Sequence, residues 1–303
     1  MLRLFWIVPM IVMLLSPAGA RAETLLPFPL PITPSTRLMV FSPHPDDESL
    51  GAAGLIQRVL QAGGKVQVVF MTKGDGFPEG VEKEDRISHP TAKDYRKYGA
   101  ERRVEAQRAT RRLGVRAGDV IFLGFPDGGL SCLCGQYATG PTAYKSPFTL
   151  QNCPPASECL IPHTDYTGQD LTRELERVIT SFCPNLIATT APEDEHPDHH
   201  ATYFFVQQAL HDLKKTHPRI NPKVLGFVVH FGQWPLTREA GTGSRLKPPA
   251  GFPEGARWVS LALTPGEALT KRQAIMEYQS QMLVMGRYLL SFARSNELFL
   301  LEH

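Results

Sequence analysis

The stretch "RLMVFSPHPDDESLG", residues 37–51, joins an apolar run to a histidine and three carboxylates. The run "RLMVFS" is typical of a strand that is buried on both faces of a parallel sheet. Three neighbouring carboxylates repel one another unless a cation, a helix N-terminus or a shared proton offsets their charge. Asp46, Asp47 and Glu48 therefore indicate either the acidic first turn of a helix or part of a metal site.

Similar apolar runs recur along the chain and alternate with helical patterns. They read "VQVVFMT", "DVIFLGF", "NLIATT" and "VLGFVVHF". This alternation predicts an α/β fold, a Rossmann-like layered fold with a mostly parallel sheet and helices on both faces. Neither G-x-G-x-x-G after the first strand nor G-x-x-x-x-G-K-[ST] occurs, so the sheet is not expected to hold nucleotide phosphates.

A second polar cluster, "APEDEHPDHH" at residues 191–200, follows the fourth predicted strand. In such sheets the carboxyl ends of the strands share one edge, so the two clusters are expected to meet there. His44 and Asp47, three positions apart, together with one histidine of "HPDHH" would supply three ligands and leave a position for water, as catalytic zinc sites do. Asp46 would then be available to act on the bound water.

The two clusters together resemble the paired signature of the PIG-L/LmbE-like zinc-dependent N-acetylglucosaminyl de-N-acetylases. The similarity extends over most of residues 37–300 and includes "RRVEAQRATRRLGV", "FLGFPDGGL" and "YLLSFARSNELF". It implies an enzyme, a zinc-dependent hydrolase that removes the N-acetyl group from an N-acetylhexosamine in a glycan or glycoconjugate. Two alternatives remain: a glycan- or metal-binding protein that has lost turnover, and a deacylase of a non-sugar amide.

The resemblance also implies roles for individual residues around the metal. Zinc would be held by His44, Asp47 and His199, with Asp46 as the general base. Glu48 is expected to cap the helix and support the site rather than to bind the metal.

Further roles concern the substrate. The resemblance implies that His196 stabilises the oxyanion or protonates the leaving amine, and that Asp198 orients His196. Arg102 and Asp127 match positions that hold sugar hydroxyls in the family, with Arg103 as the alternative to Arg102.

Simpler interpretations of some residues stay open. Asp127 in "PDGG" also suits a turn, and Arg102 with Glu105 also suits a solvated helix pair. His200 is expected on a helix face without a catalytic role. The other histidines are expected on the surface or in loops; they are His89, His163, His211, His217 and His230.

The beginning of the chain, "MLRLFWIVPMIVMLLSPAGARA", has the pattern of a signal peptide over residues 1–22. Its apolar part is shorter than the ~20 residues of a spanning helix, so no stable membrane span is expected after cleavage. A proline-rich lead-in, 23–36, would precede a single domain, 37–303, with insertions near 75–98 and 128–167. Export to the periplasm or medium argues against small cytosolic substrates and favours an envelope glycan or exopolysaccharide.

Composition adds two expectations. The net charge of +2 and the absence of a basic stripe give no indication of a nucleic-acid partner. Four cysteines in the second insertion predict two disulfides that join Cys132 and Cys134 to Cys153 and Cys159, with a zinc knuckle as the rival interpretation. Cys183 is expected to be a buried, unpaired thiol.

Overall fold

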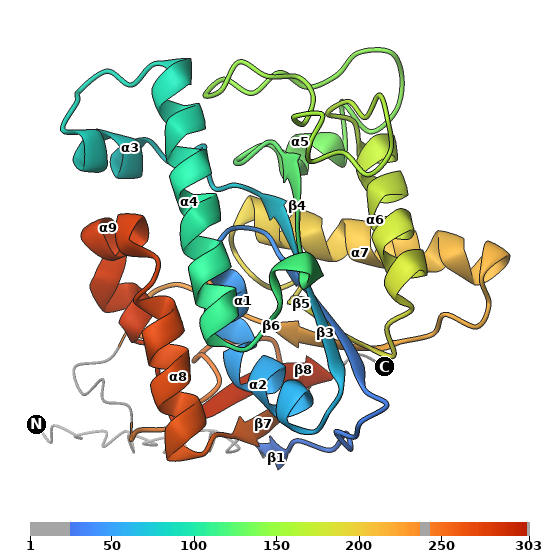
Figure 1. Cartoon of the computed structure of the whole chain (residues 1–303). Helices are drawn as coiled ribbons and strands as arrows, with labels where there is room; N and C mark the ends of the chain where they lie inside the picture. The colour runs from blue at the N-terminus through green and yellow to red at the C-terminus, as the bar shows by residue number, and fades with distance from the viewer. Residues whose placement is uncertain (1–24, 237–242, 302–303) are drawn as a thin grey trace, which may run out of the picture.

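The computed structural model describes residues 25–236 and 243–301, which form one mixed sheet covered by helices (Figure 1). The strands are β1 (Leu26–Pro27), β2 (Arg37–Ser42), β3 (Lys65–Thr72), β4 (Val120–Phe125), β5 (Leu186–Thr190), β6 (Lys223–Phe227), β7 (Trp258–Ala262) and β8 (Asn296–Leu301). The α-helices are α1 (Asp47–Gly51), α2 (Ala53–Gln61), α3 (Pro78–Asp85), α4 (Ala92–Arg112), α5 (Leu130–Leu133), α6 (Gly168–Phe182), α7 (Pro197–Thr216), α8 (Pro265–Ile275) and α9 (Gln279–Leu290), and a 3-10 helix spans Ala117–Asp119.

The strand order is β1-β7-β8-β6-β5-β2-β3-β4, and β8 is antiparallel to both of its neighbours. The other neighbouring strands are parallel, as the sequence predicted. From β2 the chain continues to β3 and β4 on one side of the sheet, and later returns to β5 and β6 on the other. The strand order therefore reverses between β2 and β5, which is where open α/β sheets bind ligands.

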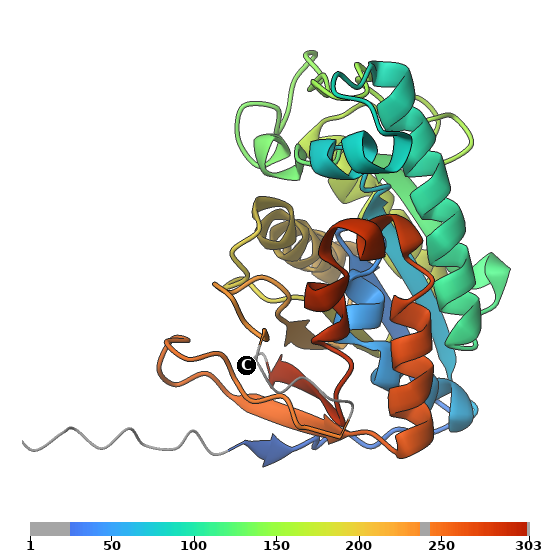
Figure 2. The same ribbon diagram turned by 90° about the vertical axis from the view of Figure 1, so that its left-hand side faces the viewer.

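Two hydrophobic cores form because side chains alternate between the faces of the sheet. Leu38 and Val40 of β2 pack in one core with residues of α2, α4 and α8. Met39 and Phe41 of the same strand pack in the other core with residues of α6 and α7. Figure 1 shows these two groups of helices on opposite sides of the sheet, and Figure 2 shows α3 beside α9.

The predicted helix after the first strand is split into α1 and α2, and its split has a local cause. Ala52 leaves the helical conformation, with φ −135° and ψ 10°. The first amides of α2, Gly54 N and Leu55 N, donate to the carboxylate of Glu297 at 2.7 and 3.0 Å. Lys271 Nζ lies 2.8 Å from the same buried carboxylate and balances its charge. A strand residue distant in sequence thus caps α2.

The ends of the domain differ in detail from the sequence pattern. The lead-in contributes β1, which pairs with β7, and the final strand β8 was not predicted. The predicted signal peptide lies outside the described residues. Within residues 25–236 and 243–301, no helix has both the length and the apolarity needed to cross a bilayer.

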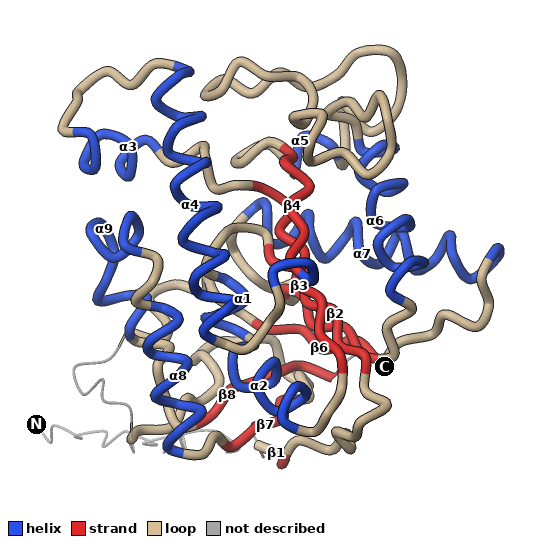
Figure 3. Tube along the Cα trace, viewed as in Figure 1, coloured by secondary structure: helices blue, strands red, loops and turns tan. Residues whose placement is uncertain are grey.

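The predicted disulfides are wrong, because all five cysteines are free thiols. The segment between α5 and α6 is irregular (Figure 3) and is held by hydrogen bonds. Tyr166 Oη donates to Gly124 O of β4 at 2.9 Å. The buried Glu174 carboxylate of α6 accepts from Leu160 N and Ile161 N at 3.1 and 3.0 Å. These contacts supply the order for which disulfides were predicted.

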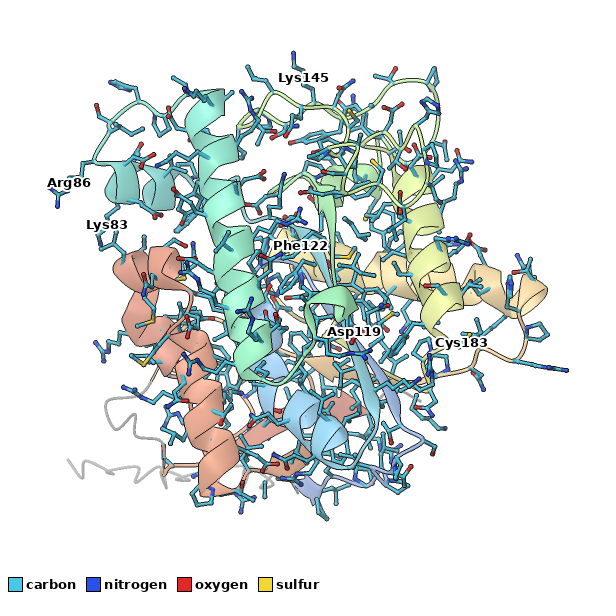
Figure 4. The ribbon with its side chains drawn as sticks, viewed as in Figure 1. Lys83, Arg86, Asp119, Phe122, Lys145 and Cys183 are labelled. Carbon is cyan, nitrogen blue, oxygen red and sulfur yellow. The ribbon has the colours of Figure 1, made fainter. Side chains whose placement is uncertain are left out.

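Cys183 is an unpaired thiol, as predicted, but the expectation that it is buried is wrong. This residue ends α6 in the left-handed conformation, with φ 52°, and its side chain is exposed (Figure 4). The rival zinc knuckle finds no support either, because the groups of described residues that could hold a metal contain no cysteine.

Candidate active site

A cavity of about 260 Å³ opens at the carboxyl edge of the sheet and is lined by residues that follow the five strands β2 to β6. His44 follows β2, Asp127 follows β4, His196 follows β5 and His230 follows β6. The predicted convergence of the two polar clusters is therefore observed, at the point where the strand order reverses.

Three donor atoms converge at the base of this cavity. His44 Nδ1 lies 3.3 Å from Asp47 Oδ2, and His199 Nε2 lies 3.2 Å from each of these two atoms. Three ligands of a tetrahedral ion with bonds of about 2.0–2.1 Å are separated by about 3.3 Å. The two imidazoles and the carboxylate therefore fit a divalent cation of the zinc type.

Carboxylates on the outer side fix both histidines. His44 Nε2 lies 3.3 Å from Asp198 Oδ2 and 3.1 Å from Asp127 Oδ1. His199 Nδ1 lies 3.1 Å from Asp194 Oδ2. Although burial opposes protonation, Asp194 and Asp47 raise the pKa of His199 to about 9 in the absence of a cation. This pairing orients the opposite nitrogen of each ring toward the metal position and makes it a better ligand.

Asp46 lies at the edge of the donor set in an unusual backbone conformation, with φ 133° and ψ −32°. Its amide donates to Glu48 Oε2 at 3.2 Å, and Tyr278 Oη donates to Glu48 Oε1 at 2.5 Å. Positive φ is rare outside glycine and persists where surrounding contacts enforce it. Burial raises the pKa of Asp46 to about 8, although the Arg102 guanidinium opposes this shift. This value holds while no cation is present; a cation bound beside Asp46 would lower the pKa again and keep the carboxylate ionised and able to accept a proton.

Arg102 is buried against the first motif. Its guanidinium donates to Pro45 O at 2.6 Å and Gly74 O at 2.9 Å, and it lies 3.3 Å from Asp46 Oδ2. Gly74 has φ 65°, and a Cβ there would overlap the guanidinium, so glycine permits this approach. Arg102 thus positions Asp46, while its predicted contact with sugar hydroxyls stays a prediction.

Neighbouring residues on α4 face other parts of the protein. Arg103 pairs with Glu158 at 2.5 Å and lies over the ring of Phe122, which Figure 4 labels beside α4. Glu105 accepts from Ser280 N at 2.8 Å at the start of α9. Arg102, rather than Arg103, therefore lines the cavity, and Glu105 is not part of a solvated pair.

Asp127 faces the metal site rather than serving only as a turn residue. Besides its contact with His44, its Oδ2 accepts from Gly76 N at 2.5 Å. Burial raises its pKa, but His44 and Arg102 outweigh burial and lower the pKa of Asp127 to about 2. The carboxylate is charged, lines the cavity and is available to a ligand there.

The implied contact between the Asp198 carboxylate and His196 is not found. That carboxylate is fully buried and accepts from Gly128 N and Leu130 N at 2.7 and 3.0 Å, besides contacting His44. Instead, the backbone amide of Asp198 donates to His196 Nδ1 at 3.2 Å. Asp198 therefore orients His196 through its backbone amide, because the Asp198 carboxylate is already bonded to the loop after β4 and contacts His44.

His230 lies in a loop, as expected, but it also lines the cavity, which the sequence did not predict. Its ring centroid lies 4.7 Å from that of His199 and 5.1 Å from that of His196, and Tyr288 stacks on it at 5.9 Å. Its amide donates to Asp194 Oδ2 at 3.0 Å, which joins the loop after β6 to the second motif. The predicted strand "VLGFVVHF" included His230, whereas β6 ends at Phe227 and leaves His230 in the loop that follows it.

Comparison with known proteins agrees with the two motifs. The family profile named PIG-L, described as GlcNAc-PI de-N-acetylase, matches residues 39–210, more than half of the chain. A deacetylase of 1D-myo-inositol 2-acetamido-2-deoxy-alpha-D-glucopyranoside from Mycobacterium leprae is 29% identical over 176 residues. This match covers 57% of the chain and 50% of the relative, so the chain spans about half the length of the curated relatives it matches.

Solved structures share the fold. The zinc inhibited form of teicoplanin deacetylase has a TM-score of 0.53 at 21% identity, with 88% of this chain and 97% of that chain covered. A 4-carboxy-2-hydroxymuconate hydratase from Pseudomonas putida has a TM-score of 0.51 at 17% identity, with 85% and 82% covered. Because one fold occurs in a deacetylase and a hydratase, function must be argued from the site.

Proposed function

The chain belongs to the PIG-L family, and from this premise we propose that it is a zinc-dependent hydrolase. Its substrate would be an N-acetylhexosamine in a glycan or glycoconjugate, from which it removes the N-acetyl group. The observation that carries the proposal is the set of three donors, His44, Asp47 and His199, separated by 3.2–3.3 Å beside the carboxylate of Asp46.

The donor set suits zinc, which binds imidazole and carboxylate in a tetrahedral arrangement. When bound, such a cation polarises the amide carbonyl and lowers the pKa of water. Asp46, held in place by Arg102 and Glu48, then accepts the proton of the attacking water.

His196 acts on the other side of the reacting amide. Because its Nδ1 accepts the Asp198 amide, a neutral His196 carries its proton on Nε2. Burial and the neighbouring imidazoles lower the pKa of His196 to about 3, which keeps the ring neutral. Its N–H can stabilise the oxyanion that forms when water adds to the amide carbon.

Bond breaking completes the reaction. The amide C–N bond breaks, the proton that Asp46 accepted passes to the leaving nitrogen, and acetate and a free amine are released. His230 and Asp127 lie on the same cavity and are positioned to contact the sugar. The alternative is a glycan- or metal-binding protein that does not cleave the C–N bond. The buried carboxylate of Asp46 supports turnover instead, because binding alone would not need a proton acceptor.

We also propose that the protein is exported and acts on an envelope glycan or exopolysaccharide. Support comes from the signal-peptide pattern of residues 1–22, which lie outside the described part of the chain. Fractionation of the source cells tests this point, and recovery of uncleaved protein in the cytoplasm would contradict it.

Measurement of acetate release tests the activity. Zinc-loaded protein should release acetate from N-acetylglucosamine and its oligomers, and Asp46→Ala protein with equal zinc content should release little. Release only from N-acyl amino acids would favour a deacylase of non-sugar amides. No release from any substrate at full zinc occupancy would refute the proposal.

A further inference from the structure

A second, larger cavity of about 890 Å³ adjoins the candidate active site. Two pairs of consecutive residues connect the cavities. His196 and His230 line the active site, while Glu195 and Phe231, their direct neighbours in sequence, line the larger cavity. The loops after β5 and β6 therefore form a shared wall. A ligand whose amide lies at the metal site would have to cross this shared wall to reach the larger cavity.

The walls of this cavity are fixed by hydrogen bonds. Leu246 N donates to Asn296 Oδ1 at 2.6 Å, and Asn296 Nδ2 donates back to Leu246 O at 3.2 Å. Trp234 Nε1 donates to Lys247 O at 2.9 Å, which joins the two sides of the cavity. These contacts hold the backbone of residues 246–247 in place, so the ordering cost of binding falls mainly on the exposed side chains of Arg245 and Lys247.

The lining combines aromatic rings with positive charge. Phe231 and Trp234 provide apolar surfaces, and the exposed side chains of Arg245 and Lys247 provide two cations. The Glu195 carboxylate accepts the amide of Gly232 at 2.7 Å, so one of its oxygens is already used. Rings next to cations suit a ligand with apolar faces and a negative group, and an acidic sugar has both.

We propose that this cavity binds an acidic sugar residue linked to the N-acetylhexosamine that reacts. This inference rests on the proposed deacetylation and specifies its substrate class: a glycan in which a uronate neighbours the reacting sugar. The free volume accommodates at least one sugar residue beyond the active site.

Acetate release from two disaccharides tests this assignment. One probe is glucuronic acid linked to N-acetylglucosamine, and the other is the neutral N,N'-diacetylchitobiose. At low salt we expect kcat/KM to favour the acidic disaccharide by about tenfold, and this preference to fall as salt screens the charges. The double variant Arg245→Gln/Lys247→Gln should lose the preference.

A matched control removes the same charges elsewhere. Arg219 and Lys223 are exposed at the amino end of β6, and Arg219→Gln/Lys223→Gln should keep the preference. Equal turnover of the two disaccharides by the natural protein, or a preference that survives Arg245→Gln/Lys247→Gln, would overturn the assignment.

Direct binding separates this inference from the proposed reaction. Calorimetry with zinc-loaded Asp46→Ala protein should give tighter binding of the acidic disaccharide, and Arg245→Gln/Lys247→Gln should weaken it. If acetate is never released but this difference in affinity is found, the proposed reaction fails and the binding site stands. Equal affinities for both disaccharides would refute the binding site even where acetate is released.

Discussion

Two loop regions at the same edge of the sheet are ordered in different ways. In the two motifs that follow β2 and β5 and run into α1 and α7, donor atoms of His44, Asp47 and His199 lie 3.2–3.3 Å apart. In the segment between α5 and α6, backbone amides donate to one buried carboxylate, Glu174, and the cysteines form no disulfides. In the first arrangement the carboxylates raise the pKa of His199 while no cation is present, and a bound cation would take the place of that proton. The second arrangement is complete without a ligand or a covalent bond.

The largest expected effects come from the two adjacent aspartates. Asp47→Ala and His199→Ala should lose zinc, since each removes one of three ligands. Asp46→Ala should retain zinc but lower kcat by about 10²–10⁴, because the proton acceptor is lost. Metal analysis and acetate release on the same samples distinguish these outcomes.

Asp165→Asn is a suitable control because Asp165 is exposed and outside the site. Should Asp46→Ala lose zinc while Asp47→Ala keeps it, the roles of the two aspartates are reversed.

A smaller effect is expected at Asp194, which contacts His199 Nδ1 and also accepts from Val229 N at 2.7 Å. Asp194→Asn should weaken zinc binding by about 10–100-fold, because the carboxylate behind a ligand histidine makes the imidazole a better ligand. Competition with a chelator measures this affinity. Unchanged affinity in a folded variant would show that the charge behind His199 is not needed.

His230→Gln should lower kcat/KM by about tenfold to a hundredfold. This range lies below the loss for a full oxyanion donor. His230 forms a possible metal-binding group with Asp47 and His199, but zinc content should not change, because His230 is not among the three donors that lie 3.2–3.3 Å apart. Loss of zinc from this variant would instead make His230 a metal ligand.

The sequence predicted the part of the site that follows from strand ends and short motifs. The proximity of His44 and His199 could be predicted because the carboxyl ends of parallel strands share one edge of the sheet. The partner of Asp198 could not be predicted, since the direction of its side chain depends on the amides of Gly128 and Leu130 in another loop. His230 was missed because a single histidine carries no spacing signal.

In the fold, too, some elements could be predicted from local sequence and others could not. The parallel strands were recognised because their apolar runs are continuous, as in "RLMVFS". The antiparallel strand β8 was not, because its place in the sheet depends on pairing with β6 and β7. Glu297 illustrates this limit, since capping of α2 by a residue more than 200 positions away is a tertiary contact.

The smallest effect is expected from the cysteines. Because all five are free thiols, reducing agent should change the melting temperature by less than about 1 °C. Glu174→Ala leaves backbone amides without their acceptor, so it should lower the free energy of unfolding by about 1–3 kcal/mol and the melting temperature by roughly 2–6 °C. Thermal unfolding with and without reductant measures both, and peptide mapping under non-reducing conditions should find no peptides joined through Cys132 or Cys134. If reduction destabilised the protein more than Glu174→Ala does, covalent bonds rather than backbone hydrogen bonds would order this segment, and the contrast between the two loop regions would fail.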